Sequence, residues 1–171
     1  EKRPAYANTI FIITGDHRLP EIPMSTRIDR YHVPLIIFSP LLKRAVSFKS
    51  ISSHLDLAPS LTAFLRNNYG LRVPTAVPWV GSGLDTSIAF RNVHRYPMKQ
   101  TIGDLRHYIS GLYFLDEDVL YDVKDRMNIE PVEDEAKRKE LLAEFDEYKA
   151  RNALFARDLK LVPDRFMNEY R

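Results

Sequence analysis

The strongest constraint on the fold of this 171-residue chain is a run of apolar residues near its start, which predicts a fully buried β-strand over residues 9–14. Gly15 ends the run, so Asp16 and His17 lie together at the carboxyl end of the strand. Ligands bind at that edge in open α/β sheets, and a carboxylate beside an imidazole offers two metal ligands. From the residues alone, the pair could equally be a general-base pair or part of a surface turn.

The composition is that of an ordinary globular protein. Hydrophobic residues make up 44% and charged residues 28% of the chain, enough for one sizeable core. The net charge is only +2, and 25 basic residues are interleaved with 23 acidic ones, so we expect no nucleic-acid partner. The chain has no apolar run of about 18 residues and opens on charged residues, which predicts neither a membrane span nor a signal peptide. The lack of cysteine excludes disulfides and thiolate metal sites.

A second strand and a helix follow the first strand. Residues 15–31 are polar and predict a long loop, and residues 33–38 predict a second buried strand. A helix is expected from a cap within residues 52–56 to about Asn67, with Gly70 in the left-handed cap position.

The second half of the chain has a different pattern. Residues 71–104 are rich in Pro and Gly and predict loops with at most one short strand, whereas residues 106–123 predict an antiparallel hairpin with its turn at 116–118. A long helix is expected over residues 132–161. Its buried stripe would consist of Leu141, Leu142, Phe145, Tyr148, Phe155 and Leu159.

The predicted fold class is α/β, but two buried strands are too few for a complete parallel sheet covered on both faces. We therefore expect the chain to be part of a larger fold. Residues 1–104 would belong to an α/β domain, and residues 105–171 would form a small antiparallel sheet with a terminal helix.

Four segments in order resemble a known family: residues 14–17 (TGDH), 31–40 (YHVPLIIFSP), 53–61 (SHLDLAPSL) and 119–123 (VLYDV). Together they resemble the sulfatase-like branch of the alkaline phosphatase superfamily, in particular the phosphoglycerol transferases of the lipoteichoic acid synthase type. The resemblance covers roughly residues 5–130. It implies the C-terminal part of a three-layer α/β/α fold, followed by a small antiparallel sheet and a long terminal helix.

The resemblance also implies a function. Asp16 and His17 would bind a divalent metal, manganese or zinc in a phosphotransferase and calcium or magnesium in a sulfatase; the imidazole favours phosphoryl transfer. The family's Thr or Ser nucleophile lies upstream of these segments, so we expect no catalytic residue within this chain and no turnover by the chain alone. The substrate would be a phosphate or sulfate ester such as a lipid head group, on the extracytoplasmic side of the cell membrane.

Three further residues are candidate substrate contacts. His32 precedes the second strand, Arg18 follows the metal pair, and His54 lies in the helix-opening segment. Each could instead have a structural or solvated role. The alternatives are that the full enzyme is a sulfatase, or that the chain is a non-catalytic α/β interaction module. An uncovered sheet would favour self-association.

Overall fold

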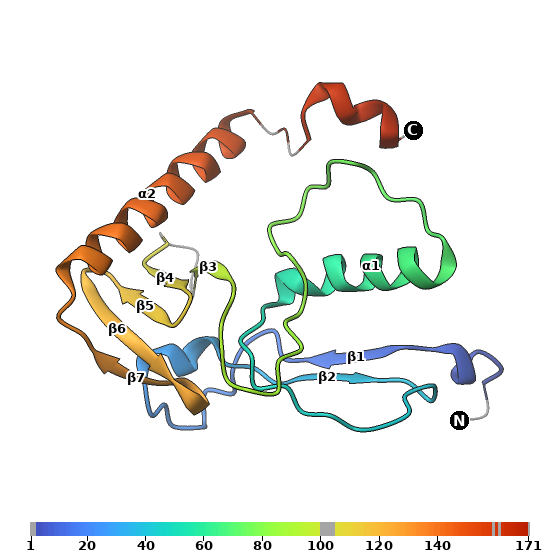
Figure 1. Ribbon diagram of the computed structural model, residues 1–171, viewed down its shortest axis with the longest axis horizontal. Coiled ribbons are helices and arrows are strands. Elements are labelled where there is room, and N and C mark those ends of the chain that lie inside the picture. The colour runs from blue at the N-terminus through green and yellow to red at the C-terminus, as the bar shows by residue number, and fades with distance from the viewer. Residues whose placement is uncertain (1–2, 100–104, 159, 161, 171) are drawn as a thin grey trace.

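The computed structural model describes residues 3–99, 105–158, 160 and 162–170, and they form two antiparallel sheets and two α-helices (Figure 1). Short 3₁₀ segments include Arg27–Tyr31, His54–Asp56 and Asp164–Tyr170. The strands and helices are β1 (Phe11–Thr14), β2 (Leu35–Phe38), α1 (Leu57–Tyr69), β3 (Arg95–Met98), β4 (His107–Ser110), β5 (Tyr113–Asp116), β6 (Val119–Lys124), β7 (Asn128–Pro131) and α2 (Glu135–Asp158).

The first sheet consists of β1 and β2 alone, paired antiparallel with Phe11 opposite Phe38 and Thr14 opposite Leu35. Both strands were predicted as buried, and this was wrong. Ile13 and Ile36, which lie opposite each other, are 58% and 54% exposed. The apolar pattern identified the strands, but within the described residues no layer closes over this sheet. The three-layer arrangement expected from the resemblance is therefore not seen in this part of the chain.

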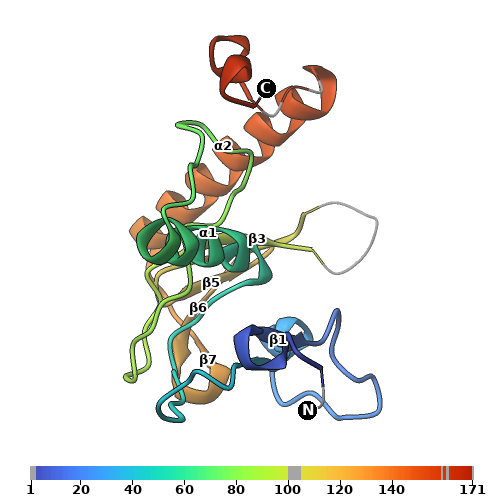
Figure 2. The ribbon, with the colours of Figure 1, turned by 90° about the vertical axis from the view of Figure 1, so that its right-hand side faces the viewer.

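Helix α1 confirms the helix predicted between residues 56 and 67. The Ser53 side chain accepts a hydrogen bond from the backbone N–H of Leu55, and Gly70 ends the helix in the left-handed conformation. In Figures 1 and 2, α1 lies between the two-stranded sheet and the loop that follows the helix. The structure describes every residue of α1, and none of them is buried.

The second sheet has five antiparallel strands in the order β3-β4-β5-β6-β7. The sequence predicted a single hairpin here, and the structure divides its first arm into β4 and β5. Gly111 adopts φ +56° in the two-residue connection between them, a turn that its lack of a Cβ permits. The predicted turn at 116–118 is present between β5 and β6, where Glu117 also has a positive φ. The small antiparallel sheet and the long terminal helix are thus confirmed.

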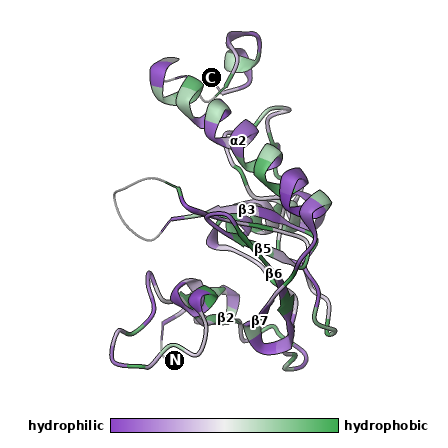
Figure 3. Cartoon of the chain, turned by 90° about the vertical axis from the view of Figure 1, so that its left-hand side faces the viewer, coloured by the Kyte–Doolittle hydropathy of each residue, from purple (hydrophilic) through white to green (hydrophobic). Residues whose placement is uncertain are grey.

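Two apolar clusters cover the two faces of this sheet. One face packs around Ile28, which belongs to the 3₁₀ segment of the first half of the chain. The other packs against the first half of α2 through Leu141 and Phe145. The second half of α2 extends beyond the sheet (Figure 3), and Phe155 is exposed, contrary to the predicted stripe. Leu159, the last residue of the predicted stripe, lies outside the described residues. Residue 104, after which the domain boundary was predicted, also lies outside them.

A buried carboxylate joins α1 to the second sheet. Asp56 is 0% exposed and accepts hydrogen bonds from the backbone N–H groups of Ser53, Ser82 and Gly83. The hydroxyl of Tyr96, on β3, donates a further hydrogen bond to it. Burial and the contact with Asp56 raise the pKa of Tyr96 above its usual range, so the hydroxyl stays protonated as the donor. The sequence predicted only a helix cap within residues 52–56, and the structure shows this wider role of Asp56.

Replacing Asp56 tests this junction. Asp56→Asn keeps the shape of the side chain but removes its charge and one acceptor oxygen, leaving buried donors unpaired. We expect the free energy of unfolding to fall by about 2–4 kcal/mol in chemical denaturation, against about 1–2 kcal/mol for Tyr96→Phe. Asp118→Asn, in an exposed turn, is the control and should be nearly neutral. Equal effects of Asp56→Asn and Asp118→Asn would contradict this account.

Candidate functional site

The candidate site lies where β1 ends beside the start of β2. Because Thr14 is opposite Leu35, the residues that follow β1 run alongside those that precede β2. The approach is close at Gly15, where an added Cβ would lie 3.6 Å from the Val33 side chain and 3.0 Å from the carbonyl oxygen of His17. Asp16 and His17 follow this close contact directly.

The side chains of Asp16 and His17 face each other in solvent. His17 Nε2 lies 3.6 Å from Asp16 Oδ1. The His17 side chain is 69% exposed and the Asp16 side chain is 93% exposed. The other ring nitrogen, Nδ1, lies 2.6 Å from the carbonyl oxygen of Arg18. A carbonyl oxygen can only accept, so in the neutral ring Nδ1 carries the proton and Nε2 keeps its lone pair.

This arrangement fits a divalent cation. Metal-binding histidines usually donate their second ring N–H to a carbonyl or carboxylate, as His17 does. Tetrahedral ligands with bonds of about 2.0–2.2 Å lie roughly 3.3–3.6 Å apart, which matches the separation of His17 Nε2 and Asp16 Oδ1. A cation could therefore bind between the two atoms with little movement of either. Among the described residues, however, no group of three or more His, Cys, Asp or Glu side chains could hold a metal ion.

The structure brings two of the other candidates to the same edge. His54 Nε2 lies 2.9 Å from the hydroxyl of Thr14, the last residue of β1. His32 is exposed and immediately precedes the segment that leads into β2, so it lies at the end of the sheet that carries Asp16 and His17. Three histidines thus lie in segments that meet or adjoin the carboxyl end of β1.

Arg18 is arranged differently. Its guanidinium donates to the carbonyl oxygens of Leu19, at 3.0 Å, and Ile22, so it closes its own loop. To meet an anionic substrate, the side chain would have to exchange these contacts.

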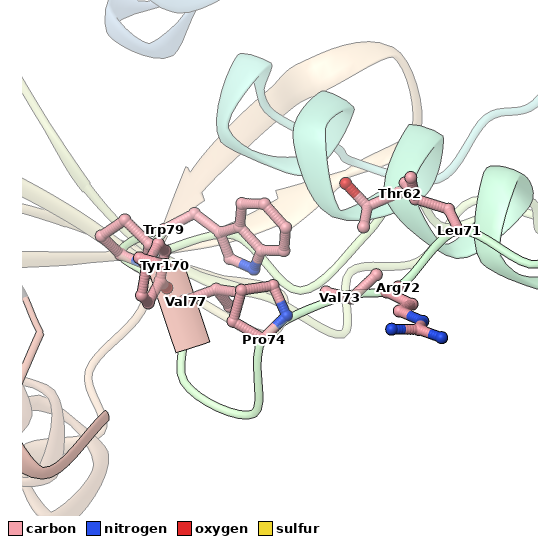
Figure 4. Close-up of a pocket in the computed structure, with 9 residues that line it drawn as sticks. Thr62, Leu71, Arg72, Val73, Pro74, Val77, Trp79 and Tyr170 are labelled. Atoms are coloured by element: carbon pink, nitrogen blue, oxygen red, sulfur yellow. The ribbon is translucent and has the colours of Figure 1, made fainter. Parts of the chain in front are cut away.

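A shallow pocket lies on the other side of α1, between the loop after α1 and the C-terminal 3₁₀ segment (Figure 4). The Tyr170 hydroxyl donates to the carbonyl oxygen of Ala76 and so holds that segment against the loop. Trp79 lines the pocket. Because α1 separates the pocket from β1 and β2, it is not part of the candidate site (Figures 1 and 2). The lining residues are Thr62, Leu71, Arg72, Val73, Pro74, Val77, Pro78, Trp79 and Tyr170.

Sequence reasoning missed a buried polar network beside the site. His107, on β4, contacts both Asp116 and Tyr31. Tyr31 immediately precedes His32 in the chain. Alternating aromatic residues predicted the strands here, but no signal in the sequence linked positions so far apart.

No protein-family model, curated protein or solved structure matches this chain. No helix in the described ranges is both long and apolar enough to cross a membrane. The interpretation of the site therefore depends on its geometry and on the sequence segments themselves.

The tautomer of His17 can be observed directly. We expect ¹⁵N-resolved NMR at neutral to mildly alkaline pH to show the Nδ1–H form of His17, because Nδ1 donates to the Arg18 carbonyl. His32 is the internal comparison, since it is exposed at the same edge. An Nε2–H form of His17 would contradict the geometry, because it would place a proton where the metal ligand must have a lone pair.

Proposed function

We propose that this chain carries part of the metal site of an enzyme that transfers phosphoryl groups or hydrolyses phosphate or sulfate esters, of the sulfatase-like type. A single observation carries the proposal: Asp16 Oδ1 and His17 Nε2 lie 3.6 Å apart, with the second nitrogen of the ring paired to a carbonyl oxygen. A solvated turn does not require this orientation of the imidazole, whereas a metal ligand does.

Asp16 and His17 would hold the cation, which in such enzymes polarises the phosphoryl oxygen and activates the nucleophile. A carboxylate oxygen and an imidazole nitrogen suit zinc or manganese, and calcium or magnesium would apply to a sulfatase. Two ligands do not complete a metal site. We therefore propose that the remaining ligands and the Thr or Ser nucleophile come from residues outside this chain, and that the chain alone has no turnover.

His32 and His54 are proposed as contacts for the charged group of the substrate. Both lie at the edge where the metal pair emerges, and imidazole N–H groups can donate to phosphate oxygens. The substrate class is a phosphate or sulfate ester, and a lipid head group at the extracytoplasmic face of the cell membrane fits the resemblance of the sequence segments. Arg18 would join them only after leaving its loop carbonyls.

We also propose that β1 and β2 belong to the central sheet of a three-layer α/β/α fold. Both faces of this strand pair carry apolar residues. Ile13 and Ile36 lie on one face, and Leu35 and Ile37 lie on the opposite face. A sheet that meets solvent on one face would alternate apolar and polar residues.

Manganese titration followed by NMR tests the metal assignment. We expect weak binding with a dissociation constant well above the micromolar range, because only two ligands are present. Paramagnetic broadening should be centred on Asp16 and His17. The variant His17→Gln should abolish it, and His94→Gln, at a buried histidine of the second half, should leave it unchanged.

Two outcomes of this titration contradict the proposal. Broadening that is spread over the carboxylates of α2, and is unaffected by His17→Gln, would show that Asp16 and His17 form an ordinary turn. Micromolar or tighter binding abolished by Asp16→Ala would show that the chain holds a complete site by itself.

The exposed first sheet also supports an interaction role. Within the described part of the chain no strand pairs with the outer edges of β1 and β2, and their side chains are largely apolar, which favours self-association. We expect the average mass of the chain in sedimentation to rise with concentration. Replacing the cross-strand pair Ile13 and Ile36 by lysine should reduce this association, and Val119→Lys, at an apolar residue of β6 that is 46% exposed, is the matched control. A strictly monomeric profile at high concentration would refute this.

A further inference from the structure

Four side chains connect the segment before His32 to the five-stranded sheet. The guanidinium of Arg27 contacts Asp116 Oδ2, and Asp116 Oδ1 lies 2.8 Å from His107 Nε2. The opposite ring nitrogen, His107 Nδ1, lies 2.6 Å from the hydroxyl of Tyr31. These contacts link the 3₁₀ segment Arg27–Tyr31 to β4 and β5, which lie far along the chain.

The hydrogen bonds in this network have defined directions. An ionised Asp116 can only accept, so Nε2 of a neutral His107 carries the proton and donates to it. Nδ1 then has a lone pair and accepts from the hydroxyl of Tyr31. Each of these contacts thus joins a donor to an acceptor, and His107 and Asp116 are both buried. The contact with Asp116 raises the pKa of Arg27, which remains charged.

Apolar packing reinforces the same attachment. Ile28 is 0% exposed and packs in one cluster with Ile109 and Phe114. The ring of His107 stacks on Phe114, with centroids 5.7 Å apart, and Tyr31 meets His107 edge-on at the same distance. The 3₁₀ segment is therefore held from two sides, by this core and by the polar network.

An Asp–His–Tyr arrangement could also suggest a catalytic tyrosine. The surroundings argue against it: burial raises the pKa of Tyr31, which opposes formation of a phenolate. The Arg27 guanidinium also offsets the charge of Asp116 that would otherwise stabilise an imidazolium. A role in holding the chain fits these groups better than a role in chemistry.

We propose that Arg27, Tyr31, His107 and Asp116 form a clamp through which the five-stranded sheet positions His32 at the edge that carries Asp16 and His17. His32 follows Tyr31 directly, and its backbone N–H donates to the carbonyl oxygen of Asp29, inside the clamped segment, at 3.0 Å. The backbone at His32 is thus anchored through strands of the other sheet. These four are positioning residues, and the ligand that His32 meets rests on the function proposed above.

Hydrogen exchange tests the clamp without any metal. Tyr31→Phe removes one hydroxyl and keeps the ring. We expect the His32 amide to exchange about tenfold faster, while the amides of β4 and β5 keep their protection. Tyr108→Phe is the matched control because it removes a tyrosine hydroxyl elsewhere. Tyr108 is a buried residue of the second sheet, and its hydroxyl donates to Glu144 at 3.3 Å. It should leave the His32 amide unchanged.

A second variant guards against loss of folding. Arg27→Met removes the outer, solvent-exposed end of the clamp and should shift the exchange of His32 in the same direction, by less. Unchanged exchange at His32 in both Tyr31→Phe and Arg27→Met would overturn the proposal. So would equal acceleration at His32 and throughout β4 and β5, because that pattern reports only global destabilisation.

Manganese added to the same samples separates this proposal from the proposed function. In the wild type, His32 should broaden together with His17. In Tyr31→Phe, the broadening at His17 should persist while that at His32 weakens. Persistence of equal broadening at both histidines in Tyr31→Phe would contradict the positioning role. Absence of broadening at His17 in the wild type would contradict the metal assignment but leave the exchange result, and so the clamp, in place.

Discussion

The arrangement of the molecule depends on the buried carboxylate of Asp56. A charged group without access to solvent is stable only when its oxygens are fully hydrogen-bonded, and Asp56 meets this requirement with donors from three separate segments. The start of α1, the loop at Ser82 and the tyrosine of β3 must therefore come together for any of them to be satisfied. His54 lies two residues before Asp56, so the same junction holds it beside Thr14.

Asp116 has a comparable role on the other side of the site. It binds Arg27 and His107 and so connects the second sheet to the segment before His32. The two histidines proposed to meet substrate each lie next to a segment fixed by a buried carboxylate. Asp16 and His17 are arranged in the opposite way: both side chains are exposed, and His17 meets Asp16 and the carbonyl oxygen of Arg18, as a ligand for a solvent-borne cation would. Under the proposed function, the second sheet would position residues of the site, and the exposed edge would bind the cation.

Much of the local structure follows from the sequence. Apolar runs located β1 and β2, and the capping residues with Gly70 located α1. The burial of β1 and β2 could not be predicted from their own residues, because a strand supplies an apolar face but not the layer that covers it. A turn at Gly111 divides the predicted first strand of the hairpin into β4 and β5. The aromatic residues on both sides of Gly111 had indicated one continuous strand. Within the site, Asp16 and His17 follow from the motif, whereas the contacts of Asp56 and Asp116 depend on tertiary packing and have no local pattern.

The proposed function requires that Asp16 and His17 bind a metal ion together. Anomalous diffraction from crystals soaked in zinc would test it most directly. We expect an anomalous peak about 2.0–2.2 Å from both Asp16 Oδ1 and His17 Nε2, with His17 Nδ1 still paired to the carbonyl oxygen of Arg18. Zinc bound elsewhere on the surface, with none between these two atoms, would contradict it.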